Sequence, residues 1–299
     1  MIVELDRISR QFRDTTALRD LTFSVPEGSV FALIGSNGAG KTTAFKILMN
    51  LIAPTRGRAT VLGTDSRKLS VEHYARIGYA SENQKLPQRM RVAEYLRYLR
   101  PFYPTWDPAL EARLMEQLRL PPDRRIGELS HGMRMKMLIA CALPYRPELL
   151  VLDEPFNGLD PLVREDLLDT LIEQCGDTTI LVSSHELAEI ETFVSHIGFM
   201  ESGRLLFQET IAELSGRLRA VRVTLQWPPP SPDHLPREWL NIQTVGNVLS
   251  FVETRFSEQA FSNRLNSTLD GIREVDVQPL DLRRTFTTLA RAAQTDAHR

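Results

Sequence analysis

The chain has 299 residues, more than one typical domain needs, so we expect a main domain with an appended one. Its 36 Lys and Arg residues nearly balance its 38 Asp and Glu residues, which gives a formal net charge of −2 at pH 7. A domain-wide basic excess that could neutralise nucleic-acid phosphates is therefore lacking, and no nucleic-acid partner is expected.

Residues 1–6 show neither the basic start nor the cleavage pattern of a secretory signal. The apolar run 137–143 is far too short to cross a bilayer, which takes about 20 residues. Cys141 and Cys175 have no metal-ligand spacing and suit reduced thiols that pack in helices. We therefore expect a cytoplasmic protein that reaches the cytoplasmic face of a membrane only through partner subunits.

The first part of the chain predicts an antiparallel β flap followed by a phosphate-binding loop. Residues 2–9 and 18–25 read as strands, the second because its apolar residues alternate before a turn. The apolar run 30–34 then leads into residues 35–43, which fit the pattern G-x-x-x-x-G-K-[ST] ahead of a helix. The alternative is a glycine-rich turn that happens to include a lysine, and the strand and helix on either side argue against it.

In such a loop, successive backbone N–H groups and a helix N-terminus converge on a polyphosphate. Its glycines let the backbone close around the ligand without a clash from a Cβ atom. Lys41 is expected to reach the β- and γ-phosphates, and the Thr42 hydroxyl is expected to bind Mg²⁺. The expected nucleotide-binding residues of the loop are Gly35, Ser36, Asn37, Gly38, Ala39, Gly40, Lys41, Thr42 and Thr43.

The middle of the chain predicts an α/β core with a helical insertion. Short strands are expected at 59–62 and 76–80, and helices dominate residues 92–143, interrupted where prolines exclude a helix interior. Two apolar runs, 149–152 and 179–182, flank a further helix. This βαβ spacing is typical of parallel strands covered on both faces.

Two acidic residues follow the first of these apolar runs. Asp153 and Glu154 stand at the carboxyl edge of the predicted sheet, where open α/β sheets bind their ligands. Asp153 is placed to hold Mg²⁺, and Glu154 is the expected general base that polarises the attacking water. The alternative is a pair of solvated acids at a strand end.

Further motifs follow one another in a set order, and with the loop at 35–43 they identify a family. They are residues 129–133 (Leu-Ser-His-Gly-Met), 153–154 (Asp-Glu), 157–160 (Asn-Gly-Leu-Asp) and His185. Over residues 2–213 the chain thereby resembles the ATP-binding subunits of ABC transporters. The resemblance implies a P-loop NTPase core that binds ATP and Mg²⁺, hydrolyses ATP to ADP and phosphate, and works as a dimer.

The resemblance also implies a composite nucleotide site. The signature residues, which would bind the ATP of the opposite subunit, are Ser130, His131, Gly132 and Met133. His131 and Met133 stand where the commonest form of the signature has a glycine and a glutamine. Asp160 is the aspartate of the D-loop.

Three more site residues follow from the same resemblance. His185 corresponds to the switch histidine that contacts the γ-phosphate, and it joins Glu154 as a catalytic residue. Phe12 occupies the position of an aromatic side chain that stacks on adenine, with a packing role in the core as the alternative. Glu82 replaces a glutamine near Mg²⁺; either side chain offers the metal an oxygen, and Gln84 is the nearby alternative.

Beyond about residue 213 the composition changes and the phosphate-binding and catalytic motifs end. A proline-rich loop at 228–236 interrupts a pattern of alternating strands and amphipathic helices. The expected elements are strands at 221–225, 248–253 and 272–277 and helices at 257–269, with Ser257 as N-cap, and at 282–293. These elements predict a small α+β domain without a chemical motif.

We therefore predict an α/β protein with a P-loop NTPase core, an antiparallel β flap and a helical subdomain at about 88–146. The ATP-binding domain should span 1–213 and the C-terminal α+β domain 214–299. The expected protein hydrolyses ATP as a homodimer, or as a heterodimer with another ATP-binding subunit. It drives transport, with export favoured, through separately encoded transmembrane permease subunits. The alternative is a soluble, non-transport ABC-type ATPase that acts on ribosomes or DNA.

Overall fold

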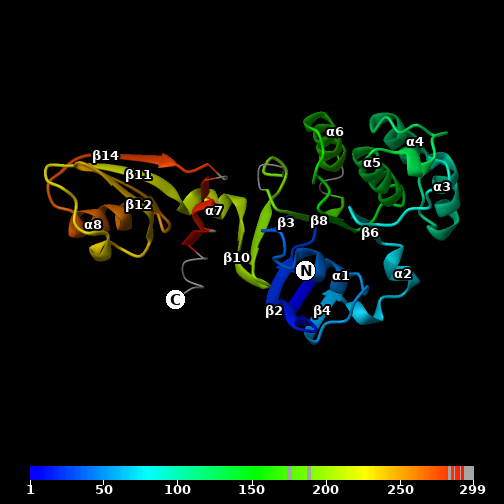
Figure 1. Cartoon of the computed structure of the whole chain (residues 1–299), viewed down its shortest axis with the longest axis horizontal. Coiled ribbons are helices and arrows are strands. Elements are labelled where there is room, and N and C mark those ends of the chain that lie inside the picture. The colour runs from blue at the N-terminus through cyan, green and yellow to red at the C-terminus, as the bar shows by residue number, and fades with distance from the viewer. Residues whose placement is uncertain (174–176, 187–189, 282–283, 286, 290, 293–299) are drawn as a thin grey trace. The chain divides into compact units, whose positions relative to one another are not determined.

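The computed structural model describes residues 1–173, 177–186, 190–281, 284–285, 287–289 and 291–292. The chain forms two compact units, Met1–Gln208 and Glu209–Arg299 (Figure 1). The boundary expected between residues 213 and 214 falls within helix α7, Ile211–Arg217, which belongs to the second unit.

An antiparallel sheet of four strands, in the order β2-β1-β4-β5, begins the first unit. Its strands are β1 (Val3–Phe12), β2 (Thr15–Val25), β4 (Arg56–Val61) and β5 (Thr64–Asp65). The apolar side chains of β1 and β2 alternate, so that Leu5 and Phe23, which face each other in the register, are both buried. The predicted antiparallel flap is confirmed, and both of its strands are longer than expected.

A second sheet of six strands, in the order β10-β9-β3-β8-β7-β6, holds the centre of the first unit. Its strands are β3 (Val30–Gly35), β6 (Ile77–Ser81), β7 (Leu149–Asp153), β8 (Thr179–Ser184), β9 (His196–Glu201) and β10 (Arg204–Thr210). The five strands from β9 to β6 pair in parallel, and every residue of β3, β7 and β8 is buried. The predicted parallel strands, covered on both faces, are thus confirmed. Their carboxyl ends meet at one edge of the sheet.

Helix α1 (Lys41–Leu48) links the two sheets, because one apolar cluster contains residues of both sheets and of α1. Phe45 and Ile47 of this helix are fully buried there. Phe23 of the flap stacks on Phe31 of β3 with ring centroids 5.6 Å apart. The phosphate-binding loop is therefore held between a buried strand and a buried helix.

Among the described residues of the first unit, the remaining helices are α2 (Val71–Tyr74), α3 (Val92–Leu99), α4 (Pro108–Gln117), α5 (His131–Ala142) and α6 (Pro161–Ile172). Short 3₁₀ turns lie at Ser66–Lys68, Arg100–Phe102 and Ile126–Glu128. Helices α3, α4 and α5 gather near the β6 side of the sheet (Figure 1). Pro108 occupies the first turn of α4, where a proline costs no hydrogen bond, and the Asp107 side chain caps that helix.

No helix in the described part of the chain has the length and apolar character needed to cross a membrane. The Cys141 thiol is free, and Cys175 lies outside the described residues.

The second unit contains an antiparallel sheet in the order β12-β13-β11-β14. Its strands are β11 (Arg219–Leu225), β12 (Trp239–Val245), β13 (Val248–Glu253) and β14 (Ile272–Pro279), and a 3₁₀ turn spans Pro232–His234. Helix α8 (Glu258–Thr268) packs on it through Phe261 and Leu265. Ser257 occupies the N-cap position of α8 as predicted, but its side chain makes no capping hydrogen bond.

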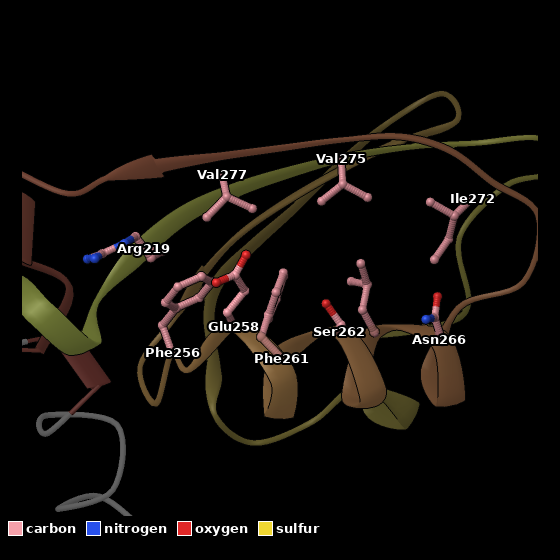
Figure 2. Close-up of a pocket in the computed structure, with 10 residues that line it drawn as sticks. Arg219, Phe256, Glu258, Phe261, Ser262, Asn266, Ile272, Val275 and Val277 are labelled. Atoms are coloured by element: carbon pink, nitrogen blue, oxygen red, sulfur yellow. The ribbon is translucent and has the colours of Figure 1, made fainter.

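A groove of about 550 Å³ opens between α8 and β14 in this unit. Figure 2 shows the side chains of α8 on one side and those of β14 on the other. The groove is lined by Arg219, Phe256, Glu258, Phe261, Ser262, Leu265, Asn266, Ile272, Val275 and Val277.

The last predicted helix, at 282–293, has both of its ends outside the described residues. The described residues within it, 284–285, 287–289 and 291–292, are helical. Thr288 is buried and its hydroxyl accepts a hydrogen bond of 2.8 Å from Asn241 Nδ2 of β12. This contact joins the final helical segment to the sheet of its own unit.

Candidate nucleotide site

Two glycines shape the phosphate-binding loop at the end of β3. A Cβ atom on Gly35 would lie 2.3 Å from the Met200 carbonyl oxygen, and one on Gly40 would lie 2.6 Å from that of Ala17. Gly40 also has a φ of 107°, in the region that favours glycine, and it is the N-cap residue of α1. Side chains at these two positions would push the loop off the neighbouring strands.

Lys41 is enclosed by the loop that precedes it. Its side chain is 4% exposed, and Nζ donates to the carbonyl oxygens of Gly35 at 2.6 Å and Ser36 at 3.2 Å. Nζ also lies 3.0 Å from Oε1 of Glu154. The ammonium group is thus held at the mouth of the loop, where a bound anion would meet it.

Asp153 ends β7 as a buried carboxylate surrounded by hydroxyl groups. It is 2% exposed and accepts hydrogen bonds from Ser183 Oγ at 2.8 Å, Thr42 Oγ1 at 3.1 Å and Ser81 Oγ at 3.3 Å. Burial raises the pKa of Asp153, and the hydroxyl groups of Ser183, Thr42 and Ser81 oppose this rise. The carboxylate has no cationic partner among these contacts.

Glu154 turns the chain at the end of β7. Its φ of 52° lies in the left-handed region, which is unusual for a residue with a side chain and costs free energy. The turn is fixed by a hydrogen bond of 2.9 Å from the Glu154 N–H to Ser183 Oγ. The Glu154 side chain that follows from this turn is 14% exposed, and one of its carboxylate oxygens pairs with Lys41.

His185 approaches the other oxygen of the same carboxylate. Its Nδ1 lies 2.9 Å from Glu154 Oε2, just beyond the end of β8. Because β3, β8 and β7 are neighbours in the sheet, Lys41, His185 and Glu154 converge although they are far apart in sequence. Three residues that were predicted to act on the nucleotide therefore form one connected group.

The signature residues lie at the start of α5. Ser130 caps this helix, since its Oγ accepts from the Met133 N–H at 3.3 Å. A Cβ atom on Gly132 would lie 3.0 Å from Val163 Cγ1 of α6, so the signature is packed on that helix. Asp160 caps α6 by accepting from the Val163 N–H at 3.0 Å.

Glu82 follows β6 directly, next to the end of β7. Its N–H donates to the Asp153 carbonyl oxygen at 3.3 Å, and its Oε2 accepts from Asn157 Nδ2 at 3.0 Å. The same Asn157 offers its carbonyl oxygen to His131 Nε2 at 2.9 Å. Glu82 and His131, two of the three residues that depart from the common family pattern, thus share Asn157 as a neighbour.

Phe12 lies at the end of β1 and is 40% exposed. The Arg10 guanidinium carbon lies 4.4 Å from the centre of its ring. The alternative of a core phenylalanine is therefore wrong, in contrast to Phe23 and Phe31, which are buried.

Sequence reasoning missed the partners of the site residues. Ser81 and Ser183 were not predicted to contact Asp153, although both stand at carboxyl ends of strands. Their role becomes visible only once β6 and β8 are known to flank β7. Asn157 was recognised as part of a motif, but nothing local indicated its two hydrogen bonds.

A phosphate-binding loop between the buried strand β3 and helix α1, with an acidic pair at the end of β7 in the same sheet, defines a P-loop NTPase. Comparison with known proteins identifies a family within this class. The family model described as ABC transporter matches residues 18–157. The bacitracin transport ATP-binding protein BcrA of Enterococcus faecalis is 34% identical over 223 residues, which cover 73% of this chain and 72% of that protein.

Two further comparisons agree. The Nod factor export ATP-binding protein I of Cupriavidus pinatubonensis is 32% identical over 209 residues, covering 68% of this chain and 64% of that protein. A solved ATP-binding subunit of an ABC transporter is 30% identical, with a TM-score of 0.65, and covers 72% of this chain and 92% of that one. The chain belongs to the ATP-binding proteins of ABC transporters.

The prediction of an ATPase whose hydrolysis of ATP is coupled to transport is thereby confirmed. The matched family and relatives give no support to the alternative of an ATPase acting on ribosomes or DNA.

Proposed function

We propose that this chain binds Mg-ATP in the loop 35–43 and hydrolyses it with Glu154 as general base. The observation that supports this most is the position of the Glu154 carboxylate, 3.0 Å from Lys41 Nζ and 2.9 Å from His185 Nδ1. A carboxylate at the rim of a phosphate-binding loop, oriented on one side by a histidine, is placed to accept a proton from water.

Lys41 and the backbone N–H groups of the loop bind the phosphates in this proposal. In the structure, Lys41 donates to two carbonyl oxygens and pairs with Glu154. The β- and γ-phosphates together carry more negative charge than the single Glu154 carboxylate, so they would compete with Oε1 for the ammonium group. That oxygen is then available to a water, while His185 keeps Oε2 in place.

Thr42 and Asp153 would hold Mg²⁺. Their oxygens are the hard ligands that this ion prefers, and the buried Asp153 carboxylate lies 3.1 Å from Thr42 Oγ1. When bound, the ion would offset negative charge on the phosphates. Ser81 and Ser183 orient the Asp153 carboxylate through their hydroxyl groups. We place Glu82 at the rim of this metal site, because its main chain adjoins Asp153.

The signature residues of one subunit would bind the ATP of a second subunit. Ser130, His131, Gly132 and Met133 surround the N-terminus of α5, where N–H groups favour an anion. Ser130 is exposed. This arrangement supports a homodimer, or a heterodimer with a related ATP-binding subunit, that encloses two ATP molecules.

The exposed Phe12 ring would stack on the base of the nucleotide. The exposed Phe12 ring places apolar surface in contact with water, which is unfavourable. Stacking on a base would remove that surface from water. Arg10 lies against this ring and would help to fix its orientation.

We further propose that hydrolysis drives export through separate transmembrane subunits, with this chain at the cytoplasmic face of the membrane. The support is the description of relatives as bacitracin transport and Nod factor export ATP-binding proteins. The segment with Glu82 and Gln84 would form one wall of the contact with the membrane subunit.

Co-purification tests this proposal. A tagged chain is extracted from membranes with its co-expressed transmembrane partner, and ATP hydrolysis is measured before and after reconstitution into vesicles. We expect a complex whose hydrolysis needs Mg²⁺ and is lost in Glu154→Gln. Failure to hydrolyse ATP would refute the catalytic proposal, whereas hydrolysis by a chain that never associates with a membrane subunit would refute the transport role.

A further inference from the structure

Asn157 connects two residues that differ from the common family pattern. Its side-chain Nδ2 donates to Glu82 Oε2 at 3.0 Å, and its main-chain oxygen lies 2.9 Å from His131 Nε2. We propose that Asn157 is a positioning residue that couples the loop carrying Glu82 to the signature at the start of α5. This inference rests on the proposed function, in which that signature binds the ATP of a second subunit.

The loop and the signature are separated by a small cavity. It has a volume of about 130 Å³, and Glu82, Gln84 and Gln88 line it from one segment, His131 and Arg134 from the other. A cavity of this size holds a few water molecules rather than packed side chains. Glu82 and His131 are therefore connected through the hydrogen bonds of Asn157, while Gln88, farther along the same segment, accepts a hydrogen bond of 3.0 Å from the Gly127 N–H ahead of the signature.

The chemistry of the two contacts gives each a defined direction. A carbonyl oxygen only accepts, so His131 Nε2 carries the proton in this contact. A carboxylate also only accepts, and a hydrogen bond from an amide to a charged acceptor is stronger than one between neutral groups. Replacing either donor therefore breaks a specific bond without removing bulk.

Asn157 is also fixed relative to the catalytic residue. Its N–H donates to the Glu154 carbonyl oxygen at 3.3 Å, within the turn that Glu154 begins. Gly158 follows with a φ of 65°, which lets the chain turn immediately after Asn157. The connection between Glu82 and His131 is thus anchored to the residue that would act as the base.

The experiment measures the ATP concentration that gives half-maximal dimerisation, in a Glu154→Gln background where hydrolysis is stopped. Asn157→Asp places an acceptor against Glu82 and should raise that concentration about tenfold or more, because one charge-assisted bond is lost and two like charges meet. ATP affinity of the monomer, measured by calorimetry, should stay unchanged, since Lys41 and the loop are intact. An altered monomer affinity would show that the substitution disturbs the P-loop itself.

A reversed pair supplies the decisive variant. Combining Asn157→Asp with Glu82→Gln restores an amide opposite a carboxylate, and the ATP concentration should return to within about twofold of the parent. His131→Leu should match the effect of Asn157→Asp and add little to it, because both act through one connection. Asn83→Ala, an exposed neighbour that also lines the cavity, should change nothing.

These outcomes separate the two proposals. If the parent dimerises with ATP but Asn157→Asp behaves like it, or the reversed pair restores nothing, the coupling through Asn157 is overturned and the proposed function stands. Multiplicative effects of Asn157→Asp and His131→Leu would also overturn the coupling. If the Glu154→Gln parent never forms an ATP-dependent dimer, the dimeric function fails first.

Discussion

Lys41 and Glu154 form a nearly buried ion pair across the nucleotide site, with Nζ 3.0 Å from Oε1 and side chains only 4% and 14% exposed. A phosphate that takes Lys41 must therefore displace a carboxylate. The Glu154 carboxylate also has His185 as a partner, so it would keep its orientation if Lys41 moved away. Under the proposed function, phosphate binding to Lys41 would release Oε1 of Glu154, while His185 stays on Oε2.

Glu154→Gln should stop turnover while leaving ATP binding at least as tight. The amide cannot accept a proton from water, and a positioned base contributes about 10²- to 10⁴-fold to the rate. Lys41 no longer leaves an ion pair when the phosphate binds. Steady-state hydrolysis and calorimetric ATP binding test both expectations, and size-exclusion chromatography should show a dimer with ATP.

Lys41→Ala is the matched control, because it removes the other half of the ion pair. ATP affinity itself should fall in this variant. A Glu154→Gln protein that turns over ATP at the normal rate would remove Glu154 from the chemistry, and unchanged affinity in Lys41→Ala would count against the assignment of the loop.

The site residues that could be predicted belong to motifs of consecutive residues. Residues 35–43 combine glycines, a lysine and threonines between a strand and a helix, and Asp153 and Glu154 directly follow an apolar run. Ser81 and Ser183 are different, because serine at a strand end is common. Their contact with Asp153 depends on the order of β6, β7 and β8 in the sheet, which local patterns do not encode.

The fold shows the same difference between elements that local sequence patterns predict and elements that depend on how strands pair. Strands with apolar alternation were found, but β12 was missed, because no element was predicted between the proline-rich loop at 228–236 and the strand at 248–253. Among the described strands it pairs only with β13, at the edge of its sheet, and Asn241, Gln243 and Thr244 give it a polar sequence. An edge strand with one solvated face lacks the buried alternation that identifies a strand. Only Trp239 at its start is buried, where it stacks on Phe251 at 3.9 Å.

Phe12→Ala should weaken the binding of ATP and GTP alike. Stacking contributes about 1–3 kcal/mol and depends on the face of the base rather than on its hydrogen-bonding groups. The dissociation constants should therefore rise about 5- to 150-fold. Thermal stability should change little, because the ring is 40% exposed. Phe23→Ala, at a buried ring of the same flap, should lower stability strongly and serves as the control. Loss of stability in Phe12→Ala with unaltered affinity would contradict stacking.

Asp153→Asn should stabilise the nucleotide-free protein in EDTA and abolish Mg-ATP hydrolysis. Burial raises the pKa of Asp153 above its ordinary 3.8, so the fold favours the protonated form more than the unfolded chain does. The charged side chain therefore costs stability above its folded pKa. That cost declines as the pH falls through the folded pKa towards 3.8.

Thermal unfolding between pH 8 and pH 4 measures this dependence. At pH 8 the Asp153→Asn protein should melt a few degrees above the parent, and the difference should shrink towards pH 4 as the parent carboxylate takes up a proton. A difference that grows with acidification would mean that the carboxylate is stabilised by its hydroxyl partners rather than penalised by burial.

Arg264→Met should destabilise the C-terminal unit without changing ATP affinity. Glu253 is fully buried, its Oε2 accepts from Trp239 Nε1 at 3.0 Å, and Arg264 Nε lies 3.4 Å from the same oxygen. Removing the cation leaves a buried charge, which costs about 3–5 kcal/mol. Amide hydrogen exchange in β13 should accelerate by about two to four orders of magnitude, while amides of β3 keep their rates. Arg255→Met is the control, because Arg255 is 76% exposed and 4.0 Å from Glu238, a surface pair that contributes at most about 1 kcal/mol. Equal exchange rates in the two variants would show that Glu253 is satisfied without Arg264.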